Sequence, residues 1–302
     1  MRPTNHPILY RRATVLMAGL VLALVACSSD SAEPTRASLP AVTSTTTTAA
    51  TTTTAVTTTT TTSTTVLDSD AESLVLVAFG DSVLSYPSPS LQAMGAYAEM
   101  LEEEFGVPVD VRDNTVFGSS PAHLLNALDS ERILADLAEA DVILLEIPQH
   151  DTAEPFMTAT GHEGRNPADC GGDDHHQCLR DYVTENKVTV EAIFSALTGV
   201  CDPSEVLIRV IDMYQMEIET QNKTDGLQIT SPYFREAQEA LAEIAATYGI
   251  PIAPVYAEFM GPDRTQDPQD RGLIRTDRRH TTRAGALLIA KMLDDLGYDL
   301  AA

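Results

Sequence analysis

The run Leu74–Phe79 is the feature that most restricts how this chain can fold. Six consecutive apolar residues, rich in Val and Leu, predict a strand buried on both faces, as in a parallel sheet covered by helices. The run ends at Gly80-Asp81, a pair typical of turns. Ser82 is therefore expected just past the carboxyl end of the strand, where ligands bind in open α/β sheets. A serine there can act as a nucleophile if a base reaches it, although Asp81 or Ser82 could instead cap a helix.

Apolar runs of the same kind recur with helical patterns between them. The further strands are expected at 107–111, 142–147, 206–211 and 250–255. Apolar residues at three- and four-residue spacing predict helices over 91–105, 123–137, 182–197, 231–248 and 284–296. This alternation predicts right-handed crossovers and a flavodoxin-like three-layer α/β/α sandwich with a five-stranded parallel sheet.

Two long connections follow the third and fourth expected strands, at 148–177 and 212–230. Both are therefore expected at the ligand edge of the sheet, where long loops are commonly functional or mobile.

Residues 1–26 have the pattern of an export signal. Arg2, Arg11 and Arg12 precede an apolar segment that is short for a membrane span. The segment ends in Ala26-Cys27, which resembles the lipobox of bacterial lipoproteins. We therefore expect cleavage before Cys27, lipidation of Cys27 and anchoring to the outer face of the bacterial cell membrane. An ordinary secretory signal with a chance cysteine is the alternative.

Residues 27–66 are rich in threonine and lack apolar periodicity, so they cannot bury a core. They predict an extended tether, which leaves residues 67–302 as a single globular domain. The formal net charge of −25 argues against a nucleic-acid partner, because phosphate contacts need clustered Lys and Arg.

A second polar pair stands near the C-terminus. Asp277 and His280 are three residues apart, just before the last expected helix. In one turn, Asp277 could hold the ring of His280, and His280 could take a proton from a serine. The alternative is that Asp277 and His280 are only a surface pair beside a helix that Thr281 or Thr282 caps.

Together these blocks resemble the SGNH (GDSL-type) hydrolases. Phe79–Ser82 is similar to the first block of that family, 113–118 to the second, and Asp277-x-x-His280 with Thr282 and Gly285 to the last. The resemblance implies that Ser82 is the nucleophile, His280 the base and Asp277 the acid that orients it. It also implies that the backbone N–H groups of Ser82 and Gly118 form the oxyanion hole.

One block departs from the family pattern. The third block is Gly-x-Asn-Asp in the family, but this chain has Pro148-Gln149-His150-Asp151. His150 thus takes the place of the asparagine that donates to the oxyanion. A histidine donates only in the correct tautomer or as the imidazolium. Gln149 is a possible substitute donor.

The resemblance implies a surface-anchored serine esterase that removes acyl or acetyl groups from a glycan or lipid, without a cofactor or metal. Its expected partners are a small ester or acylated glycan or lipid, and the membrane through Cys27; we expect a monomer. The alternatives are a non-catalytic binding or envelope-structural protein that keeps the fold, which Pro148 and His150 favour, and an O-acyltransferase.

The cysteines fit an exported protein. Besides Cys27, the chain has Cys170, Cys178 and Cys201. We favour a Cys170–Cys178 disulfide, because these two flank one polar loop, with Cys178–Cys201 as the alternative. The acidic and histidine residues His162, Asp173, Asp174, His175 and His176 of the connection 148–177 have no recognised metal-ligand spacing and predict a solvated loop.

Overall fold

The computed structural model describes residues 72–86, 92–218, 221 and 225–300. The expected signal peptide, Cys27 and the threonine-rich tether lie outside these residues. None of the helices within the described ranges has the length and apolarity needed to cross a membrane.

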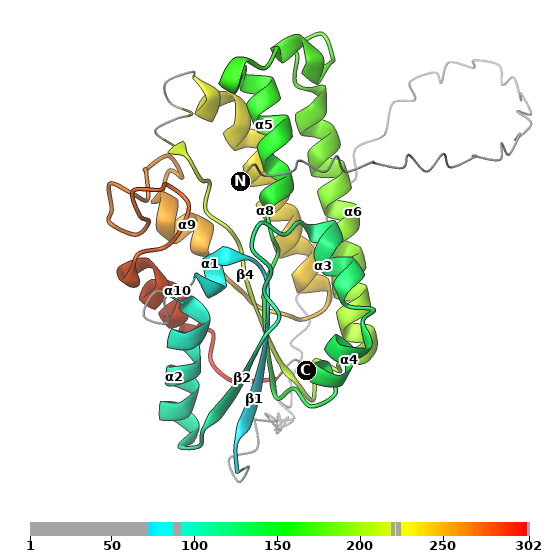
Figure 1. Cartoon of the computed structure of the whole chain (residues 1–302), viewed down its shortest axis with the longest axis vertical. Helices are drawn as coiled ribbons and strands as arrows, with labels where there is room; N and C mark the ends of the chain where they lie inside the picture. The colour runs from blue at the N-terminus through cyan, green and yellow to red at the C-terminus, as the bar shows by residue number, and fades with distance from the viewer. Residues whose placement is uncertain (1–71, 87–91, 219–220, 222–224, 301–302) are drawn as a thin grey trace, which may run out of the picture. The chain divides into compact units, whose positions relative to one another are not determined.

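Five parallel strands form one sheet in the order β2-β1-β3-β4-β5. Figure 1 labels β1, β2 and β4 of this sheet. The strands are β1 (Leu74–Phe79), β2 (Val109–Asp113), β3 (Val142–Glu146), β4 (Leu207–Ile211) and β5 (Ile252–Ala253). In the centre of the sheet, Leu76 is in register with Val111 on one side and Val142 on the other. The expected five-stranded parallel sheet is thus confirmed.

The period-two alternation of the central strands distributes their side chains between two helical layers. Leu76 and Leu144 belong to a core with α2 (Ala93–Phe105) and α10 (Arg283–Asp295). Val77 and Ile143 belong to a second core on the opposite face. That face is covered by α3 (Pro121–Ala127), α4 (Glu131–Leu137) and the second halves of α6 (Gln177–Val200) and α8 (Gly226–Thr247). The result is the expected three-layer α/β/α sandwich.

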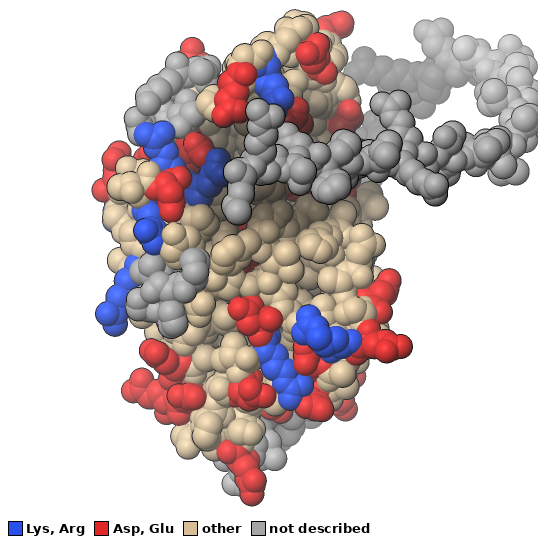
Figure 2. All heavy atoms as spheres, in the orientation of Figure 1, with Lys and Arg blue, Asp and Glu red and all other residues tan. Residues whose placement is uncertain are grey.

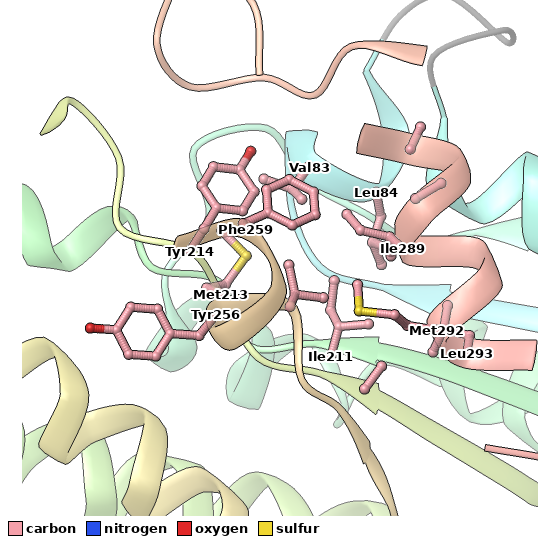
Figure 3. Packing of buried hydrophobic residues seen from close by; sticks show 14 of the residues in the cluster. Val83, Leu84, Ile211, Met213, Tyr214, Tyr256, Phe259, Ile289, Met292 and Leu293 are labelled. Atoms are coloured by element: carbon pink, nitrogen blue, oxygen red, sulfur yellow. The ribbon is translucent and has the colours of Figure 1, made fainter. Parts of the chain in front are cut away.

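The core on the α10 side reaches the short helix α1 (Ser82–Ser85). Figure 3 shows Ile289 of α10 lying near Leu84 of α1. Beside them, the rings of Tyr214 and Phe259 stack with centroids 4.8 Å apart. Phe259 belongs to α9 (Val255–Met260), so this stack fixes the segment after β4 against the segment after β5.

The connection 148–177 is more helical than its sequence predicts. It contains α5 (Ala153–Thr160) and short 3₁₀ turns at His150–Thr152, His162–Gly164 and Pro167–Cys170. A disulfide joins Cys170 to Cys178, as expected, and ties this segment to the first turn of α6. With the first halves of α6 and α8, α5 stands beyond the carboxyl ends of the strands (Figure 1).

Two other expectations need correction. The helix expected over 123–137 is broken into α3 and α4, because Ser130 accepts a hydrogen bond from the N–H of Ile133 and starts a new helix. The strand expected over 250–255 has only two residues, because Pro254 interrupts the ladder and Val255 begins α9.

Candidate active site

The turn after β1 presents Ser82 at the start of α1. Gly80 has φ +149°, and a Cβ added there would lie 2.6 Å from Oε2 of Glu146, so only glycine fits. Asp81 Oδ1 accepts a hydrogen bond of 2.8 Å from the N–H of Val83 and caps the helix. Because Asp81 is the cap, the hydroxyl of Ser82 is left for other partners.

The segment before α10 holds His280 in a short antiparallel turn. The N–H of Arg275 donates to the carbonyl oxygen of His280 over 2.8 Å. Thr282 caps α10 by accepting from the N–H of Gly285. A Cβ at Gly285 would collide with the carbonyl oxygen of Leu273, so glycine lets the helix pack directly on this turn. Thr282 and Gly285, the two motif residues after His280, therefore fix the backbone of His280.

Ser82, His280 and Asp277 form one hydrogen-bonded chain. Nε2 of His280 lies 3.0 Å from Oγ of Ser82, and Nδ1 lies 3.1 Å from Oδ2 of Asp277. With Nδ1 donating to the carboxylate, Nε2 carries the lone pair that can accept the serine proton. The structure thus brings together the three residues that the sequence predicts as nucleophile, base and orienting acid.

Asp277 is held as a carboxylate by several donors. Burial by itself would raise the pKa of Asp277, but hydrogen bonds from the backbone and ring of His280 and the N–H of Arg279 outweigh it and lower the pKa below its ordinary value. Arg275 adds a cation with Nε 3.8 Å from Oδ2. Asp277 is therefore ionised wherever His280 could act as a base.

Gly118 and His150 face each other at the same edge of the sheet. Gly118 has φ +67°, and the nearest group to a Cβ added there would be the ring of His150, with Nε2 at 3.7 Å. The connection to Gly118 extends the β1–β2 ladder, since the N–H of Val116 donates to the carbonyl oxygen of Gly80 over 2.9 Å. The position that the family gives to asparagine therefore places the imidazole beside the expected oxyanion donor.

Gln149 does not take the role of substitute donor. Its side chain is buried, Oε1 accepts from the hydroxyl of Tyr182 over 2.8 Å, and Nε2 donates to the carbonyl oxygen of Ile147. Both ends of the amide are therefore engaged inside the protein. Of the two candidate side chains in this block, His150 is the one left at the site.

The site contains residues that the sequence reasoning missed. The Tyr86 ring packs on the His280 ring with centroids 4.3 Å apart, and the Arg275 guanidinium lies 4.8 Å from the centroid of Tyr86. Below the nucleophile turn, Glu146 is fully buried. Burial raises its pKa well above the usual range, and the nearby carboxylate of Asp81 raises it further. Glu146 was detectable in principle, as a lone acid in an otherwise apolar strand.

A cavity of about 220 Å³ opens beside the triad, between α5 and the segment that follows β4. Asp81, His150 and Arg279 are among the residues that line it. The two connections expected at the ligand edge, 148–177 and 212–230, thus form most of its walls.

The described residues contain no cluster of three or more His, Cys, Asp or Glu side chains arranged to hold a metal ion. Asp174, one of the acids in the polar loop, pairs instead with Arg180 over 2.9 Å. On the face in Figure 2, described Lys and Arg side chains are interspersed with Asp and Glu rather than gathered in one continuous patch.

No protein-family model matches the sequence, and no curated protein sequence matches it. Solved protein structures, in contrast, do match this chain. A lipase, Lip_vut3 from a goat rumen metagenome, matches with a TM-score of 0.59 at 15% identity, over 75% of this chain and 98% of the lipase. A variant of the acetyl xylan esterase Axe2 from Geobacillus stearothermophilus matches with a TM-score of 0.49 at 15% identity, over 76% and 97% of the two chains. At 15% identity, the first match shows the fold alone. This chain has the three-layer α/β/α fold of that lipase.

Proposed function

We propose that this protein is a serine hydrolase of the SGNH type that cleaves carboxylic esters. The observation that carries the proposal is the hydrogen-bonded chain from Ser82 through His280 to Asp277. A serine hydroxyl is a weak nucleophile at neutral pH and needs an adjacent base. A depressed pKa at Asp277 and a packed ring at His280 favour that base in the correct tautomer.

In the proposed reaction, Nε2 of His280 takes the proton of Ser82 as its Oγ attacks the ester carbonyl. The tetrahedral intermediate collapses when His280 returns that proton to the leaving alcohol oxygen. Water then gives a proton to His280 and attacks the acyl-serine. Collapse of the second intermediate returns the proton to Ser82 and releases the carboxylic acid.

The negative charge on the carbonyl oxygen needs donors that are already in place. The backbone N–H groups of Ser82 and Gly118 are the proposed pair, and an N–H of the His150 ring is the third donor. One such donor typically lowers the barrier by about 3 kcal/mol. The approach of His150 to Gly118 supports this assignment.

Labelling with a fluorophosphonate probe tests the proposal without knowledge of the substrate. Wild type should be labelled on Ser82 and should hydrolyse short-chain aryl esters. Ser82→Ala should lose both properties while keeping its circular dichroism spectrum. Ser195→Ala, at an exposed position of α6, is the matched control. Activity or labelling that survives in Ser82→Ala would refute the proposed nucleophile.

We further propose that the protein is exported and anchored through lipidated Cys27, as the lipobox-like sequence before it indicates. Cys27→Ser should move the protein from the membrane fraction to the soluble fraction. If mass spectrometry finds an unlipidated wild-type protein in the soluble fraction, the anchoring proposal fails, whatever the enzymatic result.

A further inference from the structure

We propose that the cavity beside the triad is an acyl pocket, and that the substrate is an ester of an apolar acid longer than acetate. This inference rests on the proposed ester hydrolysis and names its substrate class.

Four Phe and Met side chains line the cavity, together with polar residues such as His162 and Glu163. Phe156 and Met157 of α5 face it from one wall, and Phe234 of α8 and Met216 from the others. Phe156 and Phe234 are themselves packed edge-to-face, with ring centroids 6.3 Å apart. An apolar surface of this kind gains free energy by removing hydrocarbon from water and offers little to a sugar hydroxyl.

The glutamines in the cavity wall have their amides engaged by the protein. Gln149 is held by Tyr182 and Ile147. Nε2 of Gln215 donates to Gln221 and to Thr230, over 3.0 and 2.7 Å, while its Oε1 accepts from the hydroxyl of Ser231.

The cation at the edge of the cavity is also engaged. Two guanidinium nitrogens of Arg279 contact Oε1 of Glu217, at 2.8 and 2.7 Å. A glycan in this cavity would therefore have to compete with existing hydrogen bonds for each of these side chains. His162 and Glu163 also line the cavity, so the part suited to hydrocarbon is the part lined by its Phe and Met side chains.

The cavity is also larger than an acetyl group requires. At about 220 Å³ it exceeds the roughly 150 Å³ of an engineered apolar cavity that binds benzene. The methyl of an acetyl group would leave most of that space unfilled. A linear chain or a ring of about six carbons makes many more van der Waals contacts with the cavity wall. The summed attraction of these contacts stabilises binding.

In this proposal the cavity receives the acyl side of the reacting bond. The alcohol oxygen must receive its proton from Nε2 of His280, so the alcohol lies toward that ring. Of the residues that line the cavity, Asp81 precedes Ser82 in the sequence, His150 lies beside Gly118, and Arg279 precedes His280. Val116 and Phe117, next to Gly118, are 43% and 56% exposed and add apolar surface at the same edge.

The test is a chain-length series of p-nitrophenyl esters, from acetate to dodecanoate, with the alcohol held constant. The value of kcat/KM should rise by roughly fourfold for each added methylene up to the length that fills the cavity. A parallel series of acetate esters with alkyl alcohols of growing length should show a much flatter response. A steeper response in the alcohol series, or a preference for an acetylated oligosaccharide over the hexanoate ester, overturns the inference.

Two variants of one residue test the cavity itself. Met157→Trp should fill it and lower the hexanoate-to-acetate ratio of kcat/KM by at least about tenfold, since roughly two or more buried methylenes, at about fourfold each, are then excluded. Met157→Ala should enlarge it and shift the best substrate to a longer chain. The opposite directions separate an effect on the cavity from a general loss of folding. Val188→Trp, on the exposed face of α6, is the control and should keep the wild-type ratio.

The outcomes separate the two proposals. A wild-type protein that is labelled on Ser82 and hydrolyses these esters without a chain-length preference refutes the acyl pocket and leaves the hydrolase standing. A wild-type protein that is neither labelled nor active on any ester refutes both. If neither Met157 variant changes the chain-length profile, the cavity is not where the acyl group binds.

Discussion

The backbone N–H of Asp81 donates a hydrogen bond to Oε2 of Glu146 over 3.0 Å. This contact places a fully buried acid directly under the turn that carries Ser82. Because burial and the nearby Asp81 carboxylate both raise the pKa of Glu146, the side chain is held in its neutral form. The end of β3 thereby supports the turn that carries Ser82 at the end of β1.

Glu146→Gln should change how stability depends on pH. An unfolded Glu titrates near ~4.3, and the folded-state pKa of Glu146 lies above that value. Its contribution to the free energy of unfolding is therefore complete below pH ~4 and falls as the pH rises, because the unfolded chain releases the proton first. Glutamine keeps the acceptor and cannot ionise. Relative to wild type, the variant should thus become more stable from pH 4 to pH 8.

Urea unfolding at several pH values measures this difference. Glu205→Gln, at an exposed position, should show no such trend. A stability difference between Glu146→Gln and wild type that is the same at every pH would mean that Glu146 titrates normally in the folded protein.

Asp277→Asn should remove most of the activity while keeping the fold. Asparagine can donate to the ring through its amide and so favour the wrong tautomer of His280, and such a change typically costs about 10⁴-fold in kcat. Steady-state kinetics on an aryl ester measures the loss. The control is Asp295→Asn, which removes an exposed ion pair with Lys291 and should be near wild type. Activity within threefold of wild type in Asp277→Asn would exclude Asp277 as the orienting acid.

His150→Asn should raise kcat/KM, because asparagine donates at every pH whereas histidine depends on its tautomer. If His150 must be charged to donate, the wild-type pH profile has an alkaline limb, and the substitution should remove it. If the neutral ring donates, wild type has no such limb. His175→Asn, in an exposed loop, is the control. A folded but inactive His150→Asn would assign His150 a role that asparagine cannot fill.

Tyr86→Ala should lower kcat more than it changes KM, because it removes the ring that supports His280 without touching the cavity. An aromatic contact of this kind contributes about 1 kcal/mol, so a loss of roughly fivefold is expected. Tyr86→Phe keeps the ring and should retain activity. Equal losses in both variants would show that the hydroxyl, rather than the ring contact, is what matters.

Removing the disulfide should destabilise the protein by about 2–3 kcal/mol, as expected for the short loop that it closes. Thermal unfolding of the Cys170→Ala/Cys178→Ala double variant measures the effect. Because the disulfide ties the segment around α5 to α6, the variant should also bind hexanoate esters less well than wild type. An unchanged midpoint together with unchanged kinetics would show that packing alone holds this segment.

The sequence predicts the central sheet well because each central strand is an apolar run that can be recognised without reference to the rest of the chain. Leu74–Phe79 is apolar on both faces and ends at a turn that only glycine can make, so β1 begins and ends where expected. The pairing of Asp277 with His280 is equally local. The contact of His280 with Ser82 is not local, and only the resemblance of several blocks to one family joined them.

The parts that could not be predicted depend on distant contacts. The N–H of Tyr256, in the first turn of α9, donates to Asp212, which lies at the end of another strand, so no adjacent capping residue marks that helix. In the connection that contains α5, a few apolar residues that face the cavity stand among many polar ones. The hydrophobic pattern of the sequence therefore does not reveal the cavity. Glu146 lies within the expected strand 142–147, and its role could not be predicted because it depends on Asp81, whose N–H it meets only after the strands have paired.

Ser82 and His280 touch across 198 residues of sequence. Under the proposed mechanism, a chain synthesised from its N-terminus therefore carries its nucleophile long before its base. Until the turn at Asp277–His280 has emerged and α10 has docked, Ser82 has no partner to take its proton. Under the proposed mechanism, the growing chain cannot cleave esters until α10 is in place, and the first turnover reports that docking.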